Sequence, residues 1–247
     1  DTVTVTATQS DNSIVLNGLD WGYYLTDEVT DNEGTHQAAS LCMVNTANPS
    51  ASVQIKSDYP SLVKKINEDD NNTGWNDIGD YEIGQTVPYK YETTVPNMSG
   101  YETYYLAFHD KMDEALTFNK DSVEITIANA KGKTYTLSGA ELSIKENVNG
   151  ETFVVEIPNL KKIVDTQFSE GLDQNGESTY GQSITVTYNA TLNDKAAEKT
   201  GRPGFENTAR LEFSNDADSD GKGETGYTPW DTVVAFTYKI NGLKINN

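Results

Sequence analysis

The sequence predicts an all-β protein of the β-sandwich type. Thr, Val, Tyr and Ile dominate its apolar stretches, and apolar and polar side chains alternate there with a period of two. Clusters of Gly, Asn and Asp separate the stretches, as turns between short antiparallel strands require. Long helical periodicity is nearly absent. Many short strands with turn signals between them favour two packed sheets.

The expected elements follow the alternation along the chain. In residues 3–7 the apolar residues Val and Ala alternate with Thr, and residues 183–192 keep a period of two over ten positions. Short helical turns are expected only at residues 111–115 and 193–199. In order, the expected strands are 3–7, 62–66, 85–95, 106–110, 122–127, 153–157, 183–192, 207–213 and 231–240.

A domain boundary is expected between residues 57 and 60. Residues 1–57 hold about four short strands by pattern, too few for an ordinary closed sandwich. We interpret 1–57 as the C-terminal part of a first β domain, or as a small domain that leans on its neighbour. Residues 58–247 are long enough for a complete second sandwich with insertions.

The chain is strongly acidic, with 38 Asp and Glu against 18 Lys and Arg and a formal net charge of −20. This balance excludes nucleic-acid binding through a basic surface and disfavours docking on anionic lipid. The mean hydropathy is −0.60, and no apolar run is long enough to suggest membrane insertion. Such a surface is typical of a soluble, exposed protein, and we expect an extracellular location.

Cysteine and histidine are scarce. Cys42 is the single cysteine, which excludes an intrachain disulfide and makes a small core residue its best interpretation. His36 and His109 are the only histidines, so a three-histidine metal site is excluded within one chain. A protein that is expected outside the cell therefore lacks the usual extracellular crosslink.

One acidic loop has the spacing of a calcium site. Asp216, Asp218 and Asp220 follow the Asp-x-Asp-x-Asp-Gly pattern of oxygen ligands. The twelfth position is Tyr227, where a bidentate Glu is usual. A structural calcium ion is the only cofactor that the sequence suggests, and a solvated acidic turn is the alternative interpretation.

Three polar residues share a strand face with apolar neighbours. Side chains two positions apart lie on the same face of a strand. The odd or even position of a residue along its strand, its parity, therefore predicts that these three side chains point into the core. The polar residues and their same-face neighbours are Lys64 with Leu62 and Ile66, Asp110 with Leu106 and Phe108, and Asn207 with Ala209, Leu211 and Phe213.

Burial would make these three groups reactive toward one another. A buried amine loses its proton more easily, and a neutral amine is a nucleophile. A protonated carboxyl can polarise an amide, so Lys64 could attack Asn207 with Asp110 shuttling protons, releasing ammonia and leaving an isopeptide bond. The alternatives are a buried ion pair with a hydrogen-bonded Asn, or three strand ends that reach solvent. His109 beside Asp110 has no nucleophile motif, so we expect no enzyme acting on an external substrate.

Four sequence blocks resemble the isopeptide-forming second domain of sortase-assembled fimbrial and pilus backbone subunits of Gram-positive bacteria. The blocks come in the order of that family over roughly residues 58–240, and 18–25 (GLDWGYYL) resembles the end of its first domain more loosely. They are 60–66 (PSLVKKI) with 75–88 (WNDIGDYEIGQTVP), 108–112 (FHDKM) with 116–123 (LTFNKDSV), 204–215 (GFENTARLEFSN), and 226–238 (GYTPWDTVVAFTY).

The resemblance implies Ig-like domains, the second of CnaA-like type, with an autocatalytic Lys–Asn crosslink. By position in the motifs, the crosslinking lysine falls on Lys64, the asparagine on Asn207 and the acid on Asp110. These are the residues that parity selects independently. The fallback residues are Lys65, Asp113 and Asn215.

The resemblance also implies a structural role at the cell surface. The expected function is that of a pilus shaft subunit that supports adhesion, is joined to other subunits by a sortase and is anchored to the cell wall, with signal and sorting segments outside this stretch. Lys56 is the candidate sortase-linkage residue, although the family's Tyr-Pro does not directly precede it.

The alternative function is an adhesin module that binds a glycan or a host protein without polymerising. Trp21, Trp75 and Trp230 could offer a stacking platform for sugars if they are exposed. Tryptophans in sandwiches are otherwise core residues or loop anchors. No residue identifies a receptor.

Overall fold

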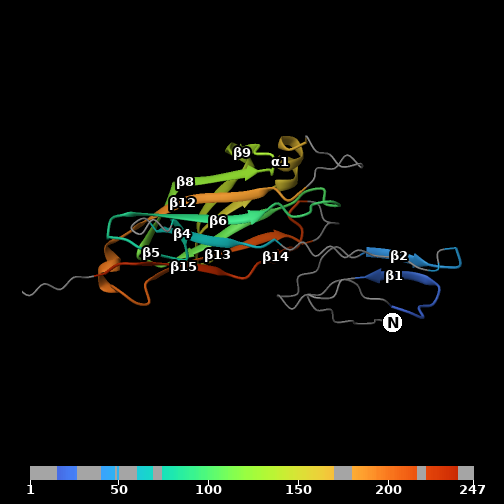
Figure 1. Ribbon diagram of the computed structural model, residues 1–247, viewed down its shortest axis with the longest axis horizontal. Coiled ribbons are helices and arrows are strands. Elements are labelled where there is room, and N and C mark those ends of the chain that lie inside the picture. Colours follow the sequence, from blue (N-terminus) through green and yellow to red (C-terminus); the bar gives the residue numbers. More distant parts are fainter. Residues whose placement is uncertain are drawn as a thin grey trace, which may run out of the picture.

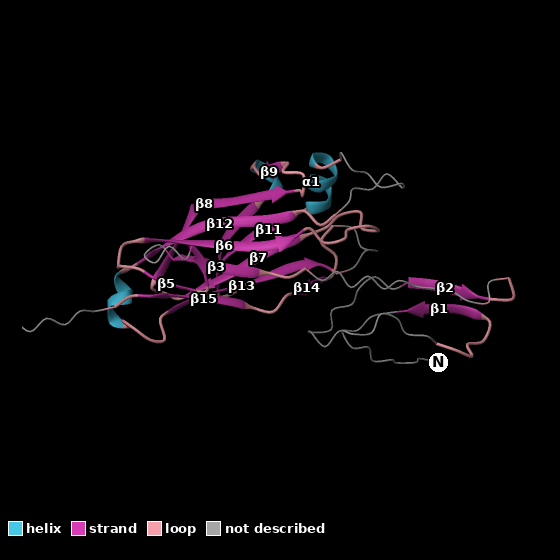
Figure 2. Cartoon of the chain, in the orientation of Figure 1, coloured by secondary structure: helices cyan, strands magenta, loops and turns pink. Residues whose placement is uncertain are grey.

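The computed structural model describes residues 16–26, 40–47, 49, 60–68, 74–169, 180–215 and 221–238. Within these residues strands predominate, and the predicted all-β fold is confirmed. Two large sheets face each other to form a sandwich (Figure 1). Figure 2 shows how little of the described chain is helical.

The first large sheet has six strands in the order β4-β3-β6-β12-β8-β9, and all neighbouring pairs are antiparallel. Along its two central strands every second side chain is buried, which is the period-two pattern of a sheet with one face on a core. The strands are β3 (Val63–Glu68), β4 (Gly74–Asn76), β6 (Thr86–Thr94), β8 (Leu116–Ala128), β9 (Thr134–Thr136) and β12 (Ser183–Leu192).

The second large sheet has seven strands in the order β10-β11-β7-β13-β15-β5, with β14 paired to β13. The β15–β5 pair is parallel, and the other described pairs are antiparallel. The strands are β5 (Ile78–Asp80), β7 (Leu106–Met112), β10 (Ser143–Val148), β11 (Glu151–Ile157), β13 (Phe205–Ser214), β14 (Thr225–Tyr227) and β15 (Asp231–Phe236).

Gly204 fixes the start of β13. Its φ is +86°, and a Cβ built there would lie 2.6 Å from Val234 Cγ1 and 2.8 Å from the Ala235 carbonyl oxygen. A side chain would therefore be both strained and overlapping, so only glycine fits this position. The close approach of β13 to β15 that results sets the register of the strand that carries Asn207.

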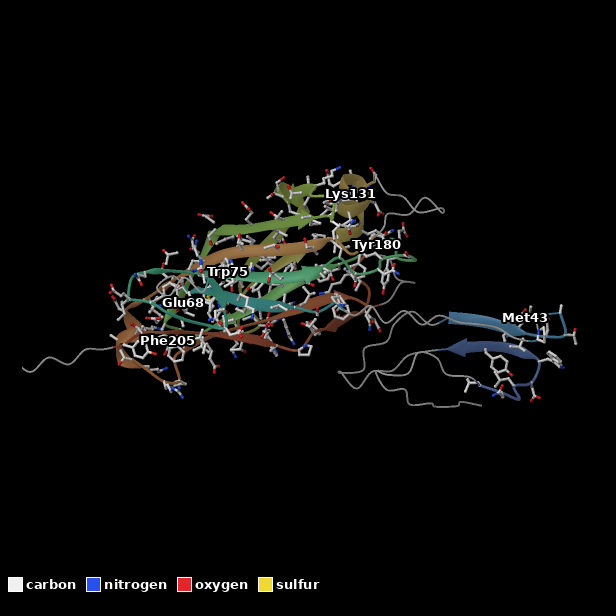
Figure 3. All side chains as sticks on the ribbon, viewed as in Figure 1. Met43, Glu68, Trp75, Lys131, Tyr180 and Phe205 are labelled. Carbon is white, nitrogen blue, oxygen red and sulfur yellow. The ribbon has the colours of Figure 1, made fainter. Side chains whose placement is uncertain are left out.

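Side chains from both sheets fill the space between them (Figure 3). Tyr89 and Tyr91 of β6 meet Phe108 of β7 and Phe153 of β11 in one continuous core cluster. Burying each large apolar side chain contributes roughly 1.5–3 kcal/mol. The core therefore lies where the two inner faces meet, and the polar residues selected by parity point into it.

The helical elements are short. The predicted turn at 193–199 is confirmed as a 3₁₀ helix over Asp194–Glu198, capped by the Asn193 side chain. The predicted helical turn at 111–115 is wrong, because β7 continues to Met112 and a tight turn follows. A further 3₁₀ helix spans Gly139–Glu141, and the α-helix α1 (Leu160–Gln167) was not predicted.

The remaining described strands, β1 (Gly22–Thr26) and β2 (Ser40–Val44), form a two-stranded antiparallel sheet of their own. The predicted strand at 3–7 lies outside the described residues, and so does the region of the predicted domain boundary up to residue 59. The division into a first domain over 1–57 and a second over 58–247 therefore stays a prediction.

Candidate functional site

Strands from both sheets bring three polar residues to one point inside the sandwich. Lys64 is on β3 of the six-stranded sheet, whereas Asp110 and Asn207 are on the neighbouring strands β7 and β13 of the seven-stranded sheet. None of the three has any exposed surface. The cluster therefore spans the gap between the two sheets.

Strand register sets the relative positions of these side chains. Asp110 and Asn207 lie two register positions apart on paired strands, so they share the inner face as diagonal neighbours. Lys64 is opposite Tyr91 of β6. Asp231 Oδ2 of β15 accepts a 2.7 Å hydrogen bond from the Lys64 backbone amide, which ties the start of β3 to the other sheet.

The Lys64 amine lies at hydrogen-bond distance from three acceptors. Its Nζ is 2.5 Å from Asp110 Oδ2, 2.6 Å from Asn207 Oδ1 and 2.9 Å from the Tyr188 hydroxyl oxygen. A protonated lysine has three N–H donors, so each donor has a partner. These bonds offset the cost of burying the charge, which is several kcal/mol per ion.

Burial changes the acidity of the amine. Loss of solvation lowers the pKa of Lys64 from 10.5 to about 8, although the charge and hydrogen bond of Asp110 act in the opposite direction. At pH 7 this raises the neutral fraction of the amine from roughly 1 in 3,000 to roughly 1 in 10. The site therefore provides an amine nucleophile that an exposed lysine does not.

Two tyrosine hydroxyls hold the carboxylate of Asp110. Tyr91 donates a short hydrogen bond to Oδ2, and Tyr188 donates to the same oxygen at 2.8 Å. Among the described residues, Asp110 Oδ1 has no hydrogen-bond partner. Sequence reasoning did not name these tyrosines. Their signal was nevertheless visible, because Tyr91 and Tyr188 have the core-facing parity of their strands.

Aromatic rings enclose the amine. The ring centroids of Tyr89, Tyr91 and Tyr188 lie 5.5, 5.0 and 5.6 Å from Lys64 Nζ. Tyr91 stacks on Phe108 at 5.5 Å between ring centroids. Such rings attract a cation and exclude water at the same time. The cluster is therefore dry, and its polar groups interact mainly with one another.

The fallback residues lie outside this cluster. Lys65 points to the other face of β3 and pairs with the exposed Asp77 at 2.6 Å. Asp113 caps the turn after β7, where its Oδ1 accepts from the Ala115 amide at 2.9 Å. Asn215 follows β13, and its backbone amide donates to the Glu224 carbonyl. The structure therefore brings together Lys64, Asp110 and Asn207 and no fallback residue.

Two other sites named from the sequence lie outside the described residues, namely Lys56 and the acidic loop of Asp216, Asp218 and Asp220. Both the sortase-linkage role and the calcium site stay predictions. In the described part of the chain, no group of three His, Cys, Asp or Glu side chains is arranged to hold a metal ion. Nor does any described helix have the length and apolar character needed to cross a membrane.

The predicted tryptophan platform is not assembled on one sheet. Trp21 precedes β1, Trp75 is on β4 of the six-stranded sheet, and Trp230 precedes β15 of the seven-stranded sheet. Figure 3 shows Trp75 on its strand. All three are exposed. Trp75 instead packs against Lys90, whose Nζ lies 4.9 Å from the ring centroid.

A second buried charge cluster lies on the outward-facing side of β7 and was not predicted. His109 Nδ1 is 2.6 Å from Glu151 Oε2, and its Nε2 is 2.9 Å from Glu212 Oε2. Arg210 contacts Glu151 at 3.2 Å, and Lys222 contacts Glu212 at 2.7 Å. Burial lowers the pKa of His109, but the hydrogen bonds to both carboxylates outweigh it and raise the pKa above 6.5.

Comparisons with known proteins identify the fold. A C-terminal fragment of the major pilin of Streptococcus agalactiae is similar over 73% of this chain and 57% of its own, with 22% identity and a TM-score of 0.50. BcpA, the major pilin subunit of Bacillus cereus, is similar over 89% of this chain and 56% of its own, with 16% identity and a TM-score of 0.50.

These likenesses define the architecture and not the activity. The chain has the β-sandwich fold of Gram-positive major pilins, and the Ig-like expectation from the sequence motifs is confirmed for the fold. The chain spans a little over half the length of these two solved structures. No protein-family model matches the chain, and no curated protein does.

Proposed function

We propose that this chain is part of a pilus or fimbria shaft subunit whose second domain is closed by an autocatalytic isopeptide bond between Lys64 and Asn207. The observation that carries the proposal is a lysine amine 2.6 Å from an asparagine amide oxygen and 2.5 Å from the carboxylate of Asp110, with no exposed surface. The pilin-like fold supports the shaft role.

The proposed reaction balances without a cofactor. One proton passes from the Lys64 ammonium to Asp110, and the neutral Nζ attacks Asn207 Cγ. The Cγ–Nδ2 bond then breaks, a second Nζ proton reaches Nδ2, and ammonia leaves. The products are the Nζ–Cγ amide, ammonia and a protonated Asp110. Each molecule reacts once, so the chain is a structural protein and not an enzyme.

The dry environment favours this reaction over its competitors. A fraction of the Lys64 amine is neutral at pH 7 because burial lowers its pKa to about 8. Fixed groups a hydrogen bond apart remove most of the entropic cost of bringing the reactants together. Exclusion of water by the surrounding rings leaves Nζ without a competing nucleophile at Asn207 Cγ.

The proposed bond has a mechanical consequence. Lys64 and Asn207 are 143 positions apart and belong to opposite sheets. In the chain-entropy description of crosslinks, a loop of this length removes about 5 kcal/mol of unfolded-state freedom. An amide cannot be reduced, unlike a disulfide. A pulling force that reaches β3 would pass through a covalent bond into β13.

Assembly is part of the same proposal. We expect a sortase to join this subunit to its neighbours at the cell wall, with Lys56 as the acceptor amine. Incubation with the cognate sortase and a sorting-motif peptide would give a covalent adduct on the natural chain. A Lys56→Ala variant should lose the adduct, and a Lys65→Ala variant should keep it. An adduct that survives in Lys56→Ala would exclude Lys56.

Intact mass under denaturing conditions tests the crosslink. Loss of ammonia lowers the mass by about 17 Da, and unfolding cannot restore it. We expect this deficit in the natural chain and its absence in Lys64→Ala and in Asn207→Ala.

Lys65→Ala and Asn215→Ala serve as matched controls, since each changes the same residue type a short distance away. Both should retain the deficit. A natural chain of full unmodified mass would contradict the proposal, and so would a deficit that persists in Asn207→Ala.

A further inference from the structure

Tyr188 has a hydroxyl that contacts all three members of the crosslinking cluster. Its oxygen accepts from Lys64 Nζ at 2.9 Å and from Asn207 Nδ2 at 3.1 Å, and it donates to Asp110 Oδ2 at 2.8 Å. A hydroxyl has one donor and two acceptor positions, so all three are used within the reacting groups.

We propose that Tyr188 is a catalytic residue of the crosslinking reaction. Its hydroxyl relays the Nζ proton that Asp110 does not take to the leaving nitrogen of Asn207. The inference rests on the proposed function, because it concerns the same reaction. It adds a proton carrier to a mechanism that otherwise relies on Asp110 alone.

The position of the leaving nitrogen requires such a carrier. Among the described residues, Asp110 makes no hydrogen bond to Asn207, whereas Asn207 Nδ2 bonds to the Tyr188 hydroxyl. Asn207 has no exposed surface and Tyr188 only 3%, so bulk water does not reach the amide. The proton for ammonia must therefore come through a protein group.

The relay balances. Lys64 Nζ starts with three protons. One remains on the new amide and one goes to Asp110. The third passes to the Tyr188 oxygen. The hydroxyl, no longer held by a carboxylate once Asp110 is protonated, gives its own proton to Asn207 Nδ2, whose lone pair is free in the tetrahedral intermediate. Tyr188 ends with the proton count it began with, the Cγ–Nδ2 bond breaks, and ammonia departs.

The hydroxyl remains protonated between these transfers. Burial first, and the negative charge of Asp110 second, raise the pKa of Tyr188 well above 10. A free tyrosinate is therefore disfavoured, and the exchange must be concerted: one proton arrives as the other leaves. The geometry fits this, since the amine and the amide nitrogen both bond to the same oxygen.

Local strand geometry supports the position of the ring. The register between β12 and β8 shifts between Thr187 and Asn189, on either side of Tyr188. Such irregularities commonly re-aim a side chain near a functional site. Phe153 and Tyr89 pack against the Tyr188 ring at centroid distances of 5.2 and 5.3 Å. The ring is thus held while its hydroxyl faces the cluster.

Tyr91 provides a matched control. It is equally buried and donates to the same Asp110 oxygen, but it makes no hydrogen bond with Lys64 or Asn207 in the described structure. If Tyr188 only stabilised the carboxylate, then Tyr91→Phe and Tyr188→Phe would have equal effects. A relay predicts that Tyr188→Phe is far slower.

The test is a time course of crosslinking. The full chain and its variants are made by cell-free translation, quenched in acid at intervals and weighed intact, so that the fraction lacking about 17 Da gives the rate. We expect Tyr188→Phe to slow crosslinking by roughly 100-fold, the usual contribution of a proton-transfer group, and Tyr91→Phe by less than tenfold. Equal slowing in the two variants, or natural speed in Tyr188→Phe, would overturn the relay.

Two further measurements separate chemistry from folding. Melting of Tyr188→Phe in an Asn207→Ala background is compared with Asn207→Ala alone, since neither can crosslink. We expect Tm to fall by several degrees, from the lost hydrogen bonds to Lys64 and Asp110, with both variants fully folded at the temperature of the time course. Site-specific 3-fluorotyrosine at position 188 keeps a hydroxyl and should restore the rate to within a few-fold of the natural chain. If Tyr188→Phe does not fold, a chain with 3-fluorotyrosine at 188 that folds but crosslinks about 100-fold more slowly than the natural chain would overturn the relay, because the hydroxyl that the relay needs is present.

Failure of the inference is distinguishable from failure of the proposed function. A natural chain without a mass deficit would remove the reaction itself. If the natural chain crosslinks and Tyr188→Phe crosslinks at the same rate, the proposed Lys64–Asn207 bond stands and only the Tyr188 relay is rejected.

Discussion

At the scale of single residues, the protein places a lysine where its usual charge is least favoured. Lys64 is surrounded by tyrosine rings and has one carboxylate, one amide and one hydroxyl as partners. Desolvation lowers its pKa to about 8, while Asp110 limits the shift. The balance makes a neutral fraction of the amine available beside Asn207, which is the condition that the proposed crosslink needs.

Asp110 can be tested by an isosteric change. Asp110→Asn keeps the size of the side chain but cannot take a proton from Lys64, so we expect the crosslinking rate to fall by at least 100-fold. Intact mass at timed intervals after translation gives the rate. Asp113→Asn, in the half-buried turn three positions on, is the control and should crosslink fully. Full crosslinking in Asp110→Asn would contradict the acid–base role.

Parity predicted which way the key side chains point but not which residues they contact. Period-two patterning aims Lys64, Asp110 and Asn207 inward, and the structure has all three buried. Which strands face each other across a sandwich depends on sheet order, which a period cannot reveal. Tyr91 and Tyr188 were overlooked for this reason: on their own strands they resemble ordinary core aromatics.

At the scale of elements, β13 carries two different clusters on its two faces. Its inner face presents Asn207 to Lys64, and its outer face presents Arg210 and Glu212 to His109 of β7. Both ring nitrogens of His109 face a carboxylate, so the charged imidazolium satisfies both and the neutral ring leaves one unmatched. The outer cluster therefore ties β7, β11 and β13 together in a pH-dependent way.

The outer cluster predicts how stability depends on pH. The folded pKa of His109 is raised above 6.5, so its contribution to the free energy of unfolding is complete below pH 6.5 and is lost as the pH rises through the folded pKa. The pKa of Glu212 is lowered to about 2, mainly because the hydrogen bonds from His109, Lys222 and Thr225 outweigh burial, so its contribution is lost as the pH falls from 4.5 toward 2.

Urea unfolding between pH 3 and pH 9 measures the free energy of unfolding on both sides of its maximum: the alkaline limb, where the contribution of His109 is lost, and the acid limb, where that of Glu212 is lost. The groups that face His109 are Glu151 of β11, Glu212 and Arg210 of β13, and the Tyr227 ring of β14. His109→Gln should flatten the alkaline limb and leave the acid limb of Glu212 visible. An alkaline limb that is unchanged in His109→Gln would show that another group titrates there.

Strand patterns were more predictable than helical ones. Long alternating stretches such as 183–192 predicted β12 closely. Helix α1 was missed because only Leu160, Ile163 and Val164 of its eight residues are buried, too few to stand out as a periodicity. The turn expected at 111–115 failed because β7 extends to Met112, whose amide bonds to the Thr152 hydroxyl of the next strand.

At the scale of the whole molecule, the sandwich has two sheets that are held together mainly by apolar contacts across the core. The proposed bond would add one covalent link between them, from β3 to β13, around a segment of 143 positions. The single cysteine cannot provide such a link. A covalent tie between the sheets suits the proposed role of a shaft subunit, which carries tension along a fibre.

Thermal unfolding tests this contribution. A loss of about 5 kcal/mol corresponds to a fall in Tm of roughly 10–20 °C for a domain of this size. We expect that fall in Asn207→Ala by calorimetry. Asn215→Ala, just beyond the end of β13, should melt with the natural chain. A Tm for Asn207→Ala within a few degrees of the natural chain would argue against a crosslink between the sheets.

Peptide mapping of the natural chain tests the central claim most directly. After unfolding and trypsin digestion, tandem mass spectrometry should find one branched peptide in which Lys64 Nζ is joined to Asn207 Cγ, with no cleavage after Lys64 and about 17 Da missing. Linear peptides that contain unmodified Asn207 and a chain cut after Lys64, in place of the branched species, would contradict the account.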